Sequence, residues 1–349
     1  MNARRRLQIA LVSDGLYAYG QQTHHRRFHE LAGRLTDRHE VHYFTWRLWD
    51  GPRDIFDSGV LLHGVVDPPA GYEPGGRLTR GEALRFARGL MPAITGRGFD
   101  VIDFSATPSL SLYAPLFGAW LAESPVVVTW HDLGAEQQDE GGRRGWKERL
   151  TQATSSRALR LARRHVAVSP LIADQLAEAG LPADRISVIG NGLELSAFED
   201  ARMSAVASDI AFVGRLAEEN GVQLLIEAVA LLRVALPEVR CLVIGDGPQR
   251  PALEALVAAR DLQKNVWFMG QIEEVEKISL LKASKLLVLP AVRDGFAMSA
   301  VEGQAAGLVP IVVRSPQSAG PAVIHAGVDG LVCDPSPDAL ADALHALLG

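Results

Sequence analysis

Short apolar runs alternate with amphipathic segments along the first half of the chain, and this alternation limits the folds open to it. Apolar runs of this length indicate strands, and the longer segments between them carry helical periodicity. A β-α-β rhythm of this kind predicts a parallel sheet with helices on both faces. The expected strands are Leu7–Val12, Val41–Thr45, Val101–Phe104, Val126–Trp130, His165–Val168 and Ile186–Ile189, and the expected helices are Gln22–Leu35 and Pro170–Glu178.

The same alternation starts again further along the chain, after a stretch without a clear period. That stretch, residues 196–208, is small and polar, and we interpret it as a linker between an N-terminal domain of residues 1–195 and a C-terminal domain of residues 209–349. The second set of expected strands is Ile210–Val213, Arg240–Ile244, Val266–Phe268, Leu286–Leu289, Val309–Val313 and Leu331–Cys333. The helices expected with them are Gly221–Val234, Pro251–Ala259, Glu273–Ala283, Ser299–Ala306 and Pro337–Leu348.

Composition places the chain among ordinary globular proteins. It has 349 residues, enough for two domains, with 48% hydrophobic residues and a net charge of −6, which argues against a nucleic-acid partner. No apolar stretch reaches the ~18 residues of a membrane span, and no export signal is expected. Cys241 and Cys333 have no metal-binding or disulfide spacing, so we expect a cytoplasmic protein.

One segment departs from this average. Residues 143–164 carry eight basic residues and a single acidic one, Glu148. Such a cluster can bind an anionic acceptor or the inner surface of a membrane, and it can equally be a solvated helix face.

The C-terminal domain carries the sharpest candidate site. Ligands of parallel sheets bind outside the carboxyl ends of the strands. Arg215 directly follows one expected strand, and the Gly-rich turn 245–248 follows another. Asp294 follows a third strand, with Glu302 eight residues later on a helix. Arginine suits a phosphate, the two carboxylates suit sugar or ribose hydroxyls, and the start of the helix offers N–H groups to a diphosphate. Each feature also has an ordinary structural explanation, as a surface ion pair or a tight turn.

The N-terminal domain offers fewer candidates. Gly20 lies in a loop after the first strand, and His131 lies at the carboxyl end of another strand. His24, His25 and His29 resemble a metal cluster only briefly, because no third ligand or H-E-x-x-H pattern accompanies them, so we expect no metal site.

Taken together, these motifs resemble the family 4 retaining glycosyltransferases, which have the GT-B fold. The resemblance extends over nearly the whole chain and rests on the order of its motifs. They are Gly20 with Arg34-Leu35, residues 129–132, 168–170 and 189–192, Gly214-Arg215-Leu216, residues 245–248, the segment from Asp294 to Glu302, and residues 327–332.

The resemblance implies two Rossmann-like domains that face each other across a cleft, and a nucleotide-diphosphate sugar as co-substrate. Arg215 would hold the diphosphate, Asp294 the donor sugar, and Glu302 the ribose. Gly20 would approach the diphosphate and His131 would lie beside the sugar. The backbone N–H groups of Gly295, Phe296, Ala297 and Met298 would bind sugar and phosphate. The family implies same-face transfer without metal or cofactor, in which a leaving phosphate oxygen takes the acceptor proton.

Several positions depart from the family pattern. Asn220 stands where a lysine would bind the diphosphate, and Asp294 replaces a glutamate. Tyr19-Gly20 replaces Gly-Gly, Ala322 stands at a common glutamate, and we expect the chain to lack the segment that in the family crosses back after the last helix. These departures motivate an alternative, a catalytically weak member that binds a nucleotide sugar or a partner subunit. A nucleotide-sugar epimerase of the same architecture is a further alternative, which the paired carboxylates and Arg215 fit less well. The acceptor class (glycan, lipid-linked or small molecule), the donor and the oligomeric state are left open.

Overall fold

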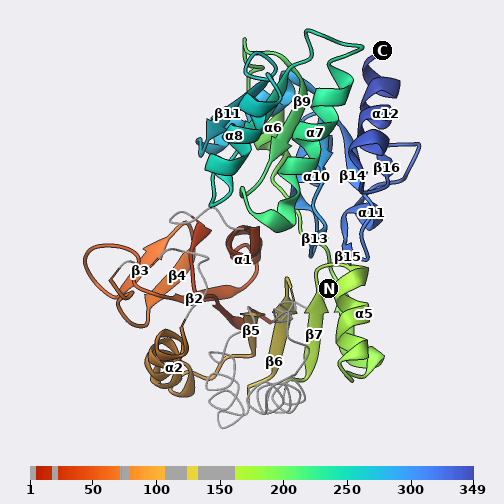
Figure 1. Cartoon of the computed structure of the whole chain (residues 1–349). Helices are drawn as coiled ribbons and strands as arrows, with labels where there is room; N and C mark the ends of the chain where they lie inside the picture. Colours follow the sequence, from red (N-terminus) through yellow and green to blue (C-terminus); the bar gives the residue numbers. More distant parts are fainter. Residues whose placement is uncertain (1–4, 18–22, 71, 73–78, 107–123, 133–161) are drawn as a thin grey trace. The chain divides into compact units, whose positions relative to one another are not determined.

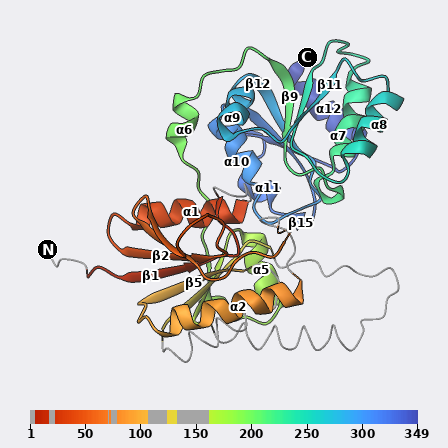
Figure 2. The same cartoon turned by 90° about the vertical axis from the view of Figure 1, so that its left-hand side faces the viewer.

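The computed structural model describes residues 5–17, 23–70, 72, 79–106, 124–132 and 162–349. The chain divides into two compact units, Met1–Gly192 (unit 1) and Leu193–Gly349 (unit 2). Each unit is built around one sheet, and the two sheets are formed by successive parts of the chain (Figures 1 and 2). The predicted class, two Rossmann-like α/β domains, is confirmed.

Unit 1 has an eight-stranded sheet in the order β3-β4-β2-β1-β5-β6-β7-β8. All neighbouring strands are parallel except β3 and β4, which form an antiparallel pair at one edge. The strands are β1 Gln8–Val12, β2 Glu40–Thr45, β3 Asp54–Asp57, β4 Val60–Gly64, β5 Val101–Ala106, β6 Val126–Trp130, β7 Arg164–Ala167 and β8 Ile186–Val188.

Two of the described helices of unit 1 begin at recognisable sequence signals. Helix α2, Arg80–Thr95, starts with a capping box between Thr79 and Glu82, and α5, Pro170–Glu178, is capped by Ser169. Helix α1, Thr23–Leu35, buries Phe28 against the sheet. Sequence analysis predicted neither α2 nor the β3–β4 pair, and the short segment Ala183–Arg185 is a 3-10 turn (η3).

Unit 2 has a six-stranded, wholly parallel sheet in the order β11-β10-β9-β12-β14-β16. Its strands are β9 Ser208–Val213, β10 Cys241–Ile244, β11 Val266–Gly270, β12 Ser284–Leu289, β14 Val309–Val313 and β16 Leu331–Cys333. Its helical segments are α6 Leu195–Asp200, η4 Glu218–Asn220, α7 Val222–Leu232, α8 Arg250–Ala259, α9 Glu274–Lys282, α10 Met298–Ala305, α11 Gly320–Val323 and α12 Pro337–Leu348. Two short strands, β13 Arg293–Asp294 and β15 Gln317–Ser318, pair beside the sheet.

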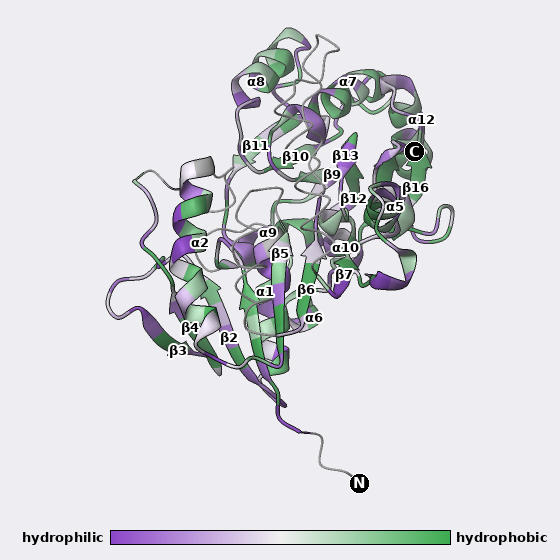
Figure 3. Ribbon diagram, turned by 90° about the horizontal axis from the view of Figure 1, so that it is seen from below, coloured by the Kyte–Doolittle hydropathy of each residue, from purple (hydrophilic) through white to green (hydrophobic). Residues whose placement is uncertain are grey.

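Both faces of the unit 2 sheet are buried. Phe212 and Val288 face a core shared with α7, α8 and α12, whereas Ala211 and Leu287 face a second core shared with α10. Because side chains alternate along a strand, covering both faces requires apolar residues at successive positions. Figure 3 shows this pattern as hydrophobic ribbon along β12. None of the helices in the described ranges is long and apolar enough to cross a lipid bilayer.

The expected linker is partly helical. Residues 195–200 form α6, and its Phe198 is buried in unit 2. Lys282 of α9 donates hydrogen bonds to the carbonyls of Phe198 and Ala201, at 2.7 and 2.6 Å. The ammonium thereby satisfies carbonyls at the end of α6, so this segment belongs to unit 2 rather than bridging freely between domains.

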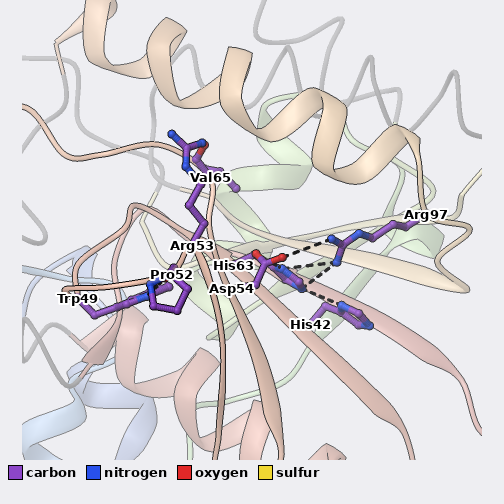
Figure 4. A network of polar contacts seen from close by, with 8 residues as sticks. All are labelled: His42, Trp49, Pro52, Arg53, Asp54, His63, Val65 and Arg97. Atoms are coloured by element: carbon purple, nitrogen blue, oxygen red, sulfur yellow. Dashed lines mark hydrogen bonds and ion pairs between the residues drawn. The ribbon is translucent and has the colours of Figure 1, made fainter.

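Two buried histidines, His42 of β2 and His63 of β4, contact each other near one edge of the unit 1 sheet (Figure 4). His42 Nδ1 lies 2.9 Å from His63 Nε2, His42 Nε2 lies 3.1 Å from a Glu40 oxygen, and His63 Nδ1 lies 2.9 Å from Asp54 Oδ1. Arg97 contacts His63 from beyond the end of α2. Burial is the largest cause lowering the pKa of both histidines. The cluster fastens β2, β3 and β4 to one another.

Candidate functional site

Three loops meet at the carboxyl edge of the unit 2 sheet. They follow β9, β10 and β12, and backbone hydrogen bonds hold them together. Gly214 N–H donates to the carbonyl of Ile244 at 3.0 Å, and Leu216 N–H donates to that of Asp246 at 2.9 Å. Val292 N–H donates to the carbonyl of Glu219 at 2.9 Å. This edge is where ligands bind in parallel sheets, so the loops form the candidate site.

Two glycines allow the loops to approach so closely. Gly245 has a φ of +134°, and a Cβ there would lie 1.9 Å from the carbonyl oxygen of Gly214. Gly221 has a φ of +65°, and its Cβ would lie 2.2 Å from the carbonyl oxygen of Pro290. Any other residue would clash with backbone and adopt an unfavourable conformation. The glycines therefore fix the relative positions of the three loops.

Arg215 is exposed on the first loop. Its carbonyl accepts a hydrogen bond from the Asn220 side-chain amide at 2.7 Å. Asn220 ends the short helix η4 and precedes Gly221. The amide of Asn220 thus binds the backbone that carries Arg215, instead of offering a second cation to a ligand.

Asp294 closes the third loop. Its Oδ1 accepts hydrogen bonds from the N–H groups of Phe296 at 2.9 Å and Ala297 at 2.7 Å. Ala297 has a φ of +60° and precedes α10, so this carboxylate holds a left-handed turn at the start of a helix. Two of the four N–H groups expected to bind the donor are bound to Asp294 in this structure.

Glu302 lies on α10 and is 5% exposed. Its Oε1 lies 3.0 Å from the ammonium of Lys277 on α9, and the same ammonium lies 2.8 Å from Glu274. Sequence analysis did not single out Lys277. The residue lies 25 positions from its partner on another helix, and only the fold brings the two together.

Arg250, the first residue of α8, forms ion pairs with two carboxylates. It lies 2.9 Å from Asp246 and 2.8 Å from Glu254. Hydrogen bonds to Glu254 and Asp246 raise the pKa of Arg250, and the N–H of Gly247 is the main cause lowering the pKa of Asp246. Arg250 is therefore paired with one carboxylate on the loop before α8 and one on the helix itself.

Comparison with known families decides the assignment. Residues 25–197 match the model described as Glycosyltransferase Family 4, and residues 206–349 match Glycosyl transferases group 1. This chain is a family 4 glycosyltransferase.

The curated relatives of this family 4 glycosyltransferase are named for different activities. Glycogen synthase of Mycobacterium tuberculosis (strain H37Rv) is 29% identical over 228 residues, which are 64% of this chain and 54% of the relative. The 2-deoxystreptamine glucosyltransferase of Streptomyces kanamyceticus is 40% identical over 98 residues, 28% of this chain and 25% of the relative. The chain spans about half the length of the first of these relatives.

Solved structures share the GT-B fold of the family. Sucrose-phosphate synthase from Thermosynechococcus elongatus has a TM-score of 0.78 at 21% identity, over 98% of this chain and 90% of that one. Anabaena HepE in complex with UDP-glucose has a TM-score of 0.74 at 17% identity, over 98% of this chain and 89% of that one. At these identities the likeness establishes the fold.

The remaining site predictions for this glycosyltransferase fall in unit 1. His131 follows β6, with its ring 6.2 Å from that of Phe28. Gly20 lies outside the described residues. Of the basic segment 143–164, the structure describes residues 162–164, and Arg164 donates a hydrogen bond to the Asp184 carbonyl. Within the described part of the chain, no three His, Cys, Asp or Glu side chains are grouped so that they could hold a metal ion. Of the three histidines near the start of α1, His25 lies 3.4 Å from the Asp14 carboxylate.

Proposed function

We propose that this chain transfers a sugar from a nucleotide-diphosphate sugar to an acceptor hydroxyl, with retention of the anomeric configuration and without a metal ion. The observation that carries the proposal is the group of loops at the carboxyl edge of the unit 2 sheet. They carry an exposed guanidinium, Arg215, and lead into α10 with its buried carboxylate, Glu302, and Gly221 and Gly245 allow the loops to approach one another closely.

Each group has a chemical role in this proposal. The guanidinium of Arg215 pairs with the diphosphate, because two of its N–H groups meet two phosphate oxygens. The N-terminus of α10 favours the same negative charge through its dipole and its N–H groups. Glu302 accepts hydrogen bonds from the ribose hydroxyls, and Lys277 orients its carboxylate.

The reaction exchanges one bond at the anomeric carbon. The bond from that carbon to the diphosphate oxygen breaks, and a bond to the acceptor oxygen forms on the same face of the sugar. The acceptor proton passes to an oxygen of the leaving diphosphate. The chain's contribution is to position the reactants and to stabilise the charge that develops on the diphosphate.

The names of relatives support a nucleotide sugar as the donor. HepE was crystallised with UDP and with UDP-glucose, and two of the curated relatives are named as a glycogen synthase and a glucosyltransferase. These are properties of those proteins, and they define the first compounds to test here.

Release of nucleoside diphosphate from a panel of nucleotide sugars tests the proposal. We expect one donor to be turned over in the presence of an acceptor, with unchanged rates in EDTA and a product of the donor's anomeric configuration. Arg215→Ala and Glu302→Gln should each lower kcat/KM about 10- to 150-fold, since each removes a charged contact worth about 1.5–3 kcal/mol.

Arg260→Ala provides the matched control. Arg260 is exposed, pairs with Glu227 at 2.9 Å and caps the C-terminal end of α8, whereas the loop after β10 leads into the other end of that helix. Its variant should retain full activity. Full activity in the Arg215 and Glu302 variants, or donor binding with no release against any acceptor, would contradict the proposal.

A further inference from the structure

Two buried imidazole rings connect the strands at one edge of the unit 1 sheet. β4 lies between β2, to which it is parallel, and the edge strand β3, to which it is antiparallel. His63 of β4 is level with Asp54 of β3 on one side and with Phe44 of β2 on the other, and His42 is two residues before Phe44. The polar contacts drawn in Figure 4 therefore run across all three strands.

The contacts of His63 determine which of its ring nitrogens carries a hydrogen. Its Nδ1 lies 2.9 Å from Asp54 Oδ1, and because a carboxylate only accepts, this nitrogen must donate. Its Nε2 lies 3.1 Å from a terminal nitrogen of Arg97, which only donates, so this nitrogen must accept. The network therefore requires a neutral His63 with its hydrogen on Nδ1.

The contacts of His42 follow from those of its neighbour. Its Nδ1 lies 2.9 Å from the accepting Nε2 of His63, so it donates. Its Nε2 lies 3.1 Å from the Glu40 carboxylate, and this contact is a hydrogen bond only when Nε2 also carries a hydrogen. The network thus accommodates one additional proton, on Nε2 of His42, whereas a proton on Nε2 of His63 would break the contacts of that ring with His42 and Arg97.

Aromatic side chains surround the two rings. Phe44 stacks on His63 with ring centroids 4.5 Å apart, and Phe99 lies edge-on to His42 at 5.1 Å. The side chains of His42 and His63 are 8% and 6% exposed. Little water reaches either ring, so charge on them is supported only by the polar groups of the network.

The charged groups that act on the pair are Glu40 of β2, Asp54 of β3 and Arg97, which follows α2. Burial is the largest cause that lowers the pKa of each ring, and Arg97 lowers it further. Asp54 raises the pKa of both rings, and Glu40 raises that of His42. The balance keeps both pKa values below the ordinary value.

β3 and β4 form a hairpin that can separate from the sheet as one piece. Ser58 and Gly59 connect the two strands, with φ of +49° and +87°. β3 is the last strand of the sheet, and its Phe56 is 71% exposed. Separation of the hairpin from β2 would bring both rings into water, where a histidine binds a proton near its ordinary pKa of about 6.5.

We propose that the His42–His63 pair makes the β3–β4 hairpin sensitive to pH, so that the hairpin is closed at neutral pH and opens in mild acid, when His63 takes up a proton on the nitrogen that accepts from His42 and Arg97. A ring whose pKa is lower in the closed hairpin than in water binds protons on opening. Its contribution to stability is therefore complete above about pH 7 and is lost as the pH falls below about 6.5. This inference does not depend on the proposed function of unit 2.

Hydrogen exchange of the full chain between about pH 7.5 and 5 tests the proposal. The measured rates are first corrected for the intrinsic pH dependence of amide exchange. The protection of residues 54–64 should then fall at least about tenfold for each pH unit below about 6, because opening takes up at least one proton. The protection of β12 in unit 2 should fall less steeply. Protection of residues 54–64 that is independent of pH would overturn the proposal.

His63→Gln removes the titrating ring and keeps an acceptor. The glutamine oxygen can accept from His42 and Arg97, so the hairpin should stay closed at neutral pH. Its loss of protection from about pH 6 to 5 should be about tenfold smaller than in the original chain, because opening takes up one proton fewer. The matched control is His325→Gln, since His325 is 82% exposed and pairs with Asp329 in unit 2, and it should leave the hairpin unchanged. A loss as steep in His63→Gln as in the original chain would contradict the proposal.

Nitrogen-15 NMR of the histidine side chains provides a test that needs no variant to fold. At neutral pH the ring of His63 in the original chain should carry its hydrogen on Nδ1 and none on Nε2. A hydrogen on Nε2 of His63 at neutral pH, in a neutral or a charged ring, would disprove the hydrogen-bond assignment and the proposal with it.

Discussion

Replacing Lys277 with methionine should destabilise unit 2 strongly. The ammonium of Lys277 lies 3.0 Å from Glu302 and 2.8 Å from Glu274, with side-chain exposures of 14%, 7% and 25% for the three residues. Removing one partner of a buried ion pair costs about 3–5 kcal/mol, because the other charge stays enclosed. Partial exposure of Glu274 favours the lower end, about 3 kcal/mol.

Hydrogen exchange of β12, in the core of unit 2, measures this loss directly. A change of about 3 kcal/mol raises the exchange rate of globally protected amides about a hundredfold, and for a unit of this size it lowers the melting temperature by about 6–12 °C. The double variant Lys277→Met with Glu302→Gln should recover part of the loss, since it also removes the enclosed charge.

Lys285→Met is the matched control. Lys285 lies 2.8 Å from Asp209, but its side chain is 67% exposed, so the variant should cost less than about 1 kcal/mol. A Lys277 variant that exchanges no faster than the Lys285 variant would refute the reasoning.

Three further predictions concern individual side chains. Asp103→Asn should gain stability relative to the original chain as the pH rises from about 4 to 6, by up to about 3 kcal/mol. Burial raises the pKa of Asp103 to about 6, so the folded chain holds a proton there that the unfolded chain has lost, which pH-dependent denaturation will show. Gly221→Ala should cost more than about 2 kcal/mol by denaturant unfolding, through its positive φ and its contact with Pro290, whereas Gly33→Ala, whose Cβ meets no atom, should be neutral or stabilising. Asp294→Asn should keep the turn before α10, because the amide oxygen can still accept both hydrogen bonds. Asp294→Glu moves the accepting oxygen away from the two N–H groups and should lower the free energy of unfolding by about 2 kcal/mol in the same assay. Equal stabilities of the two variants would contradict the capping role.

The fold could be predicted because its signals are local. Alternating apolar runs mark the strands, and Arg215 and Asp294 directly follow strands, so their place at the carboxyl edge needs only the parallel topology. Helix α2 also had a readable signal, with Thr79 and Glu82 before apolar residues at helical spacing, and sequence analysis overlooked it.

The partners of the site residues could not be predicted because they are distant in sequence. Lys277 meets Glu302 only where α9 and α10 pack, and Arg27 meets Asn191 across 164 positions. Asp103 lies within an apolar strand pattern. The sequence does not show that a threonine on the neighbouring strand donates a hydrogen bond to its carboxylate. The side chains of Asn220 and Asp294 form hydrogen bonds with the backbone of their own loops, and these contacts likewise depend on loop conformation. From the sequence motifs, both residues were instead expected near a bound donor.

Hydrogen exchange of the full chain with and without UDP tests the central claim most directly. If the unit 2 loops bind a nucleotide diphosphate, residues 214–217, 245–248 and 294–302 gain protection when UDP or the matching nucleotide is added, and Arg215→Ala abolishes that gain. Protection confined to other segments, or unchanged by the Arg215 variant, would show that the nucleotide binds elsewhere.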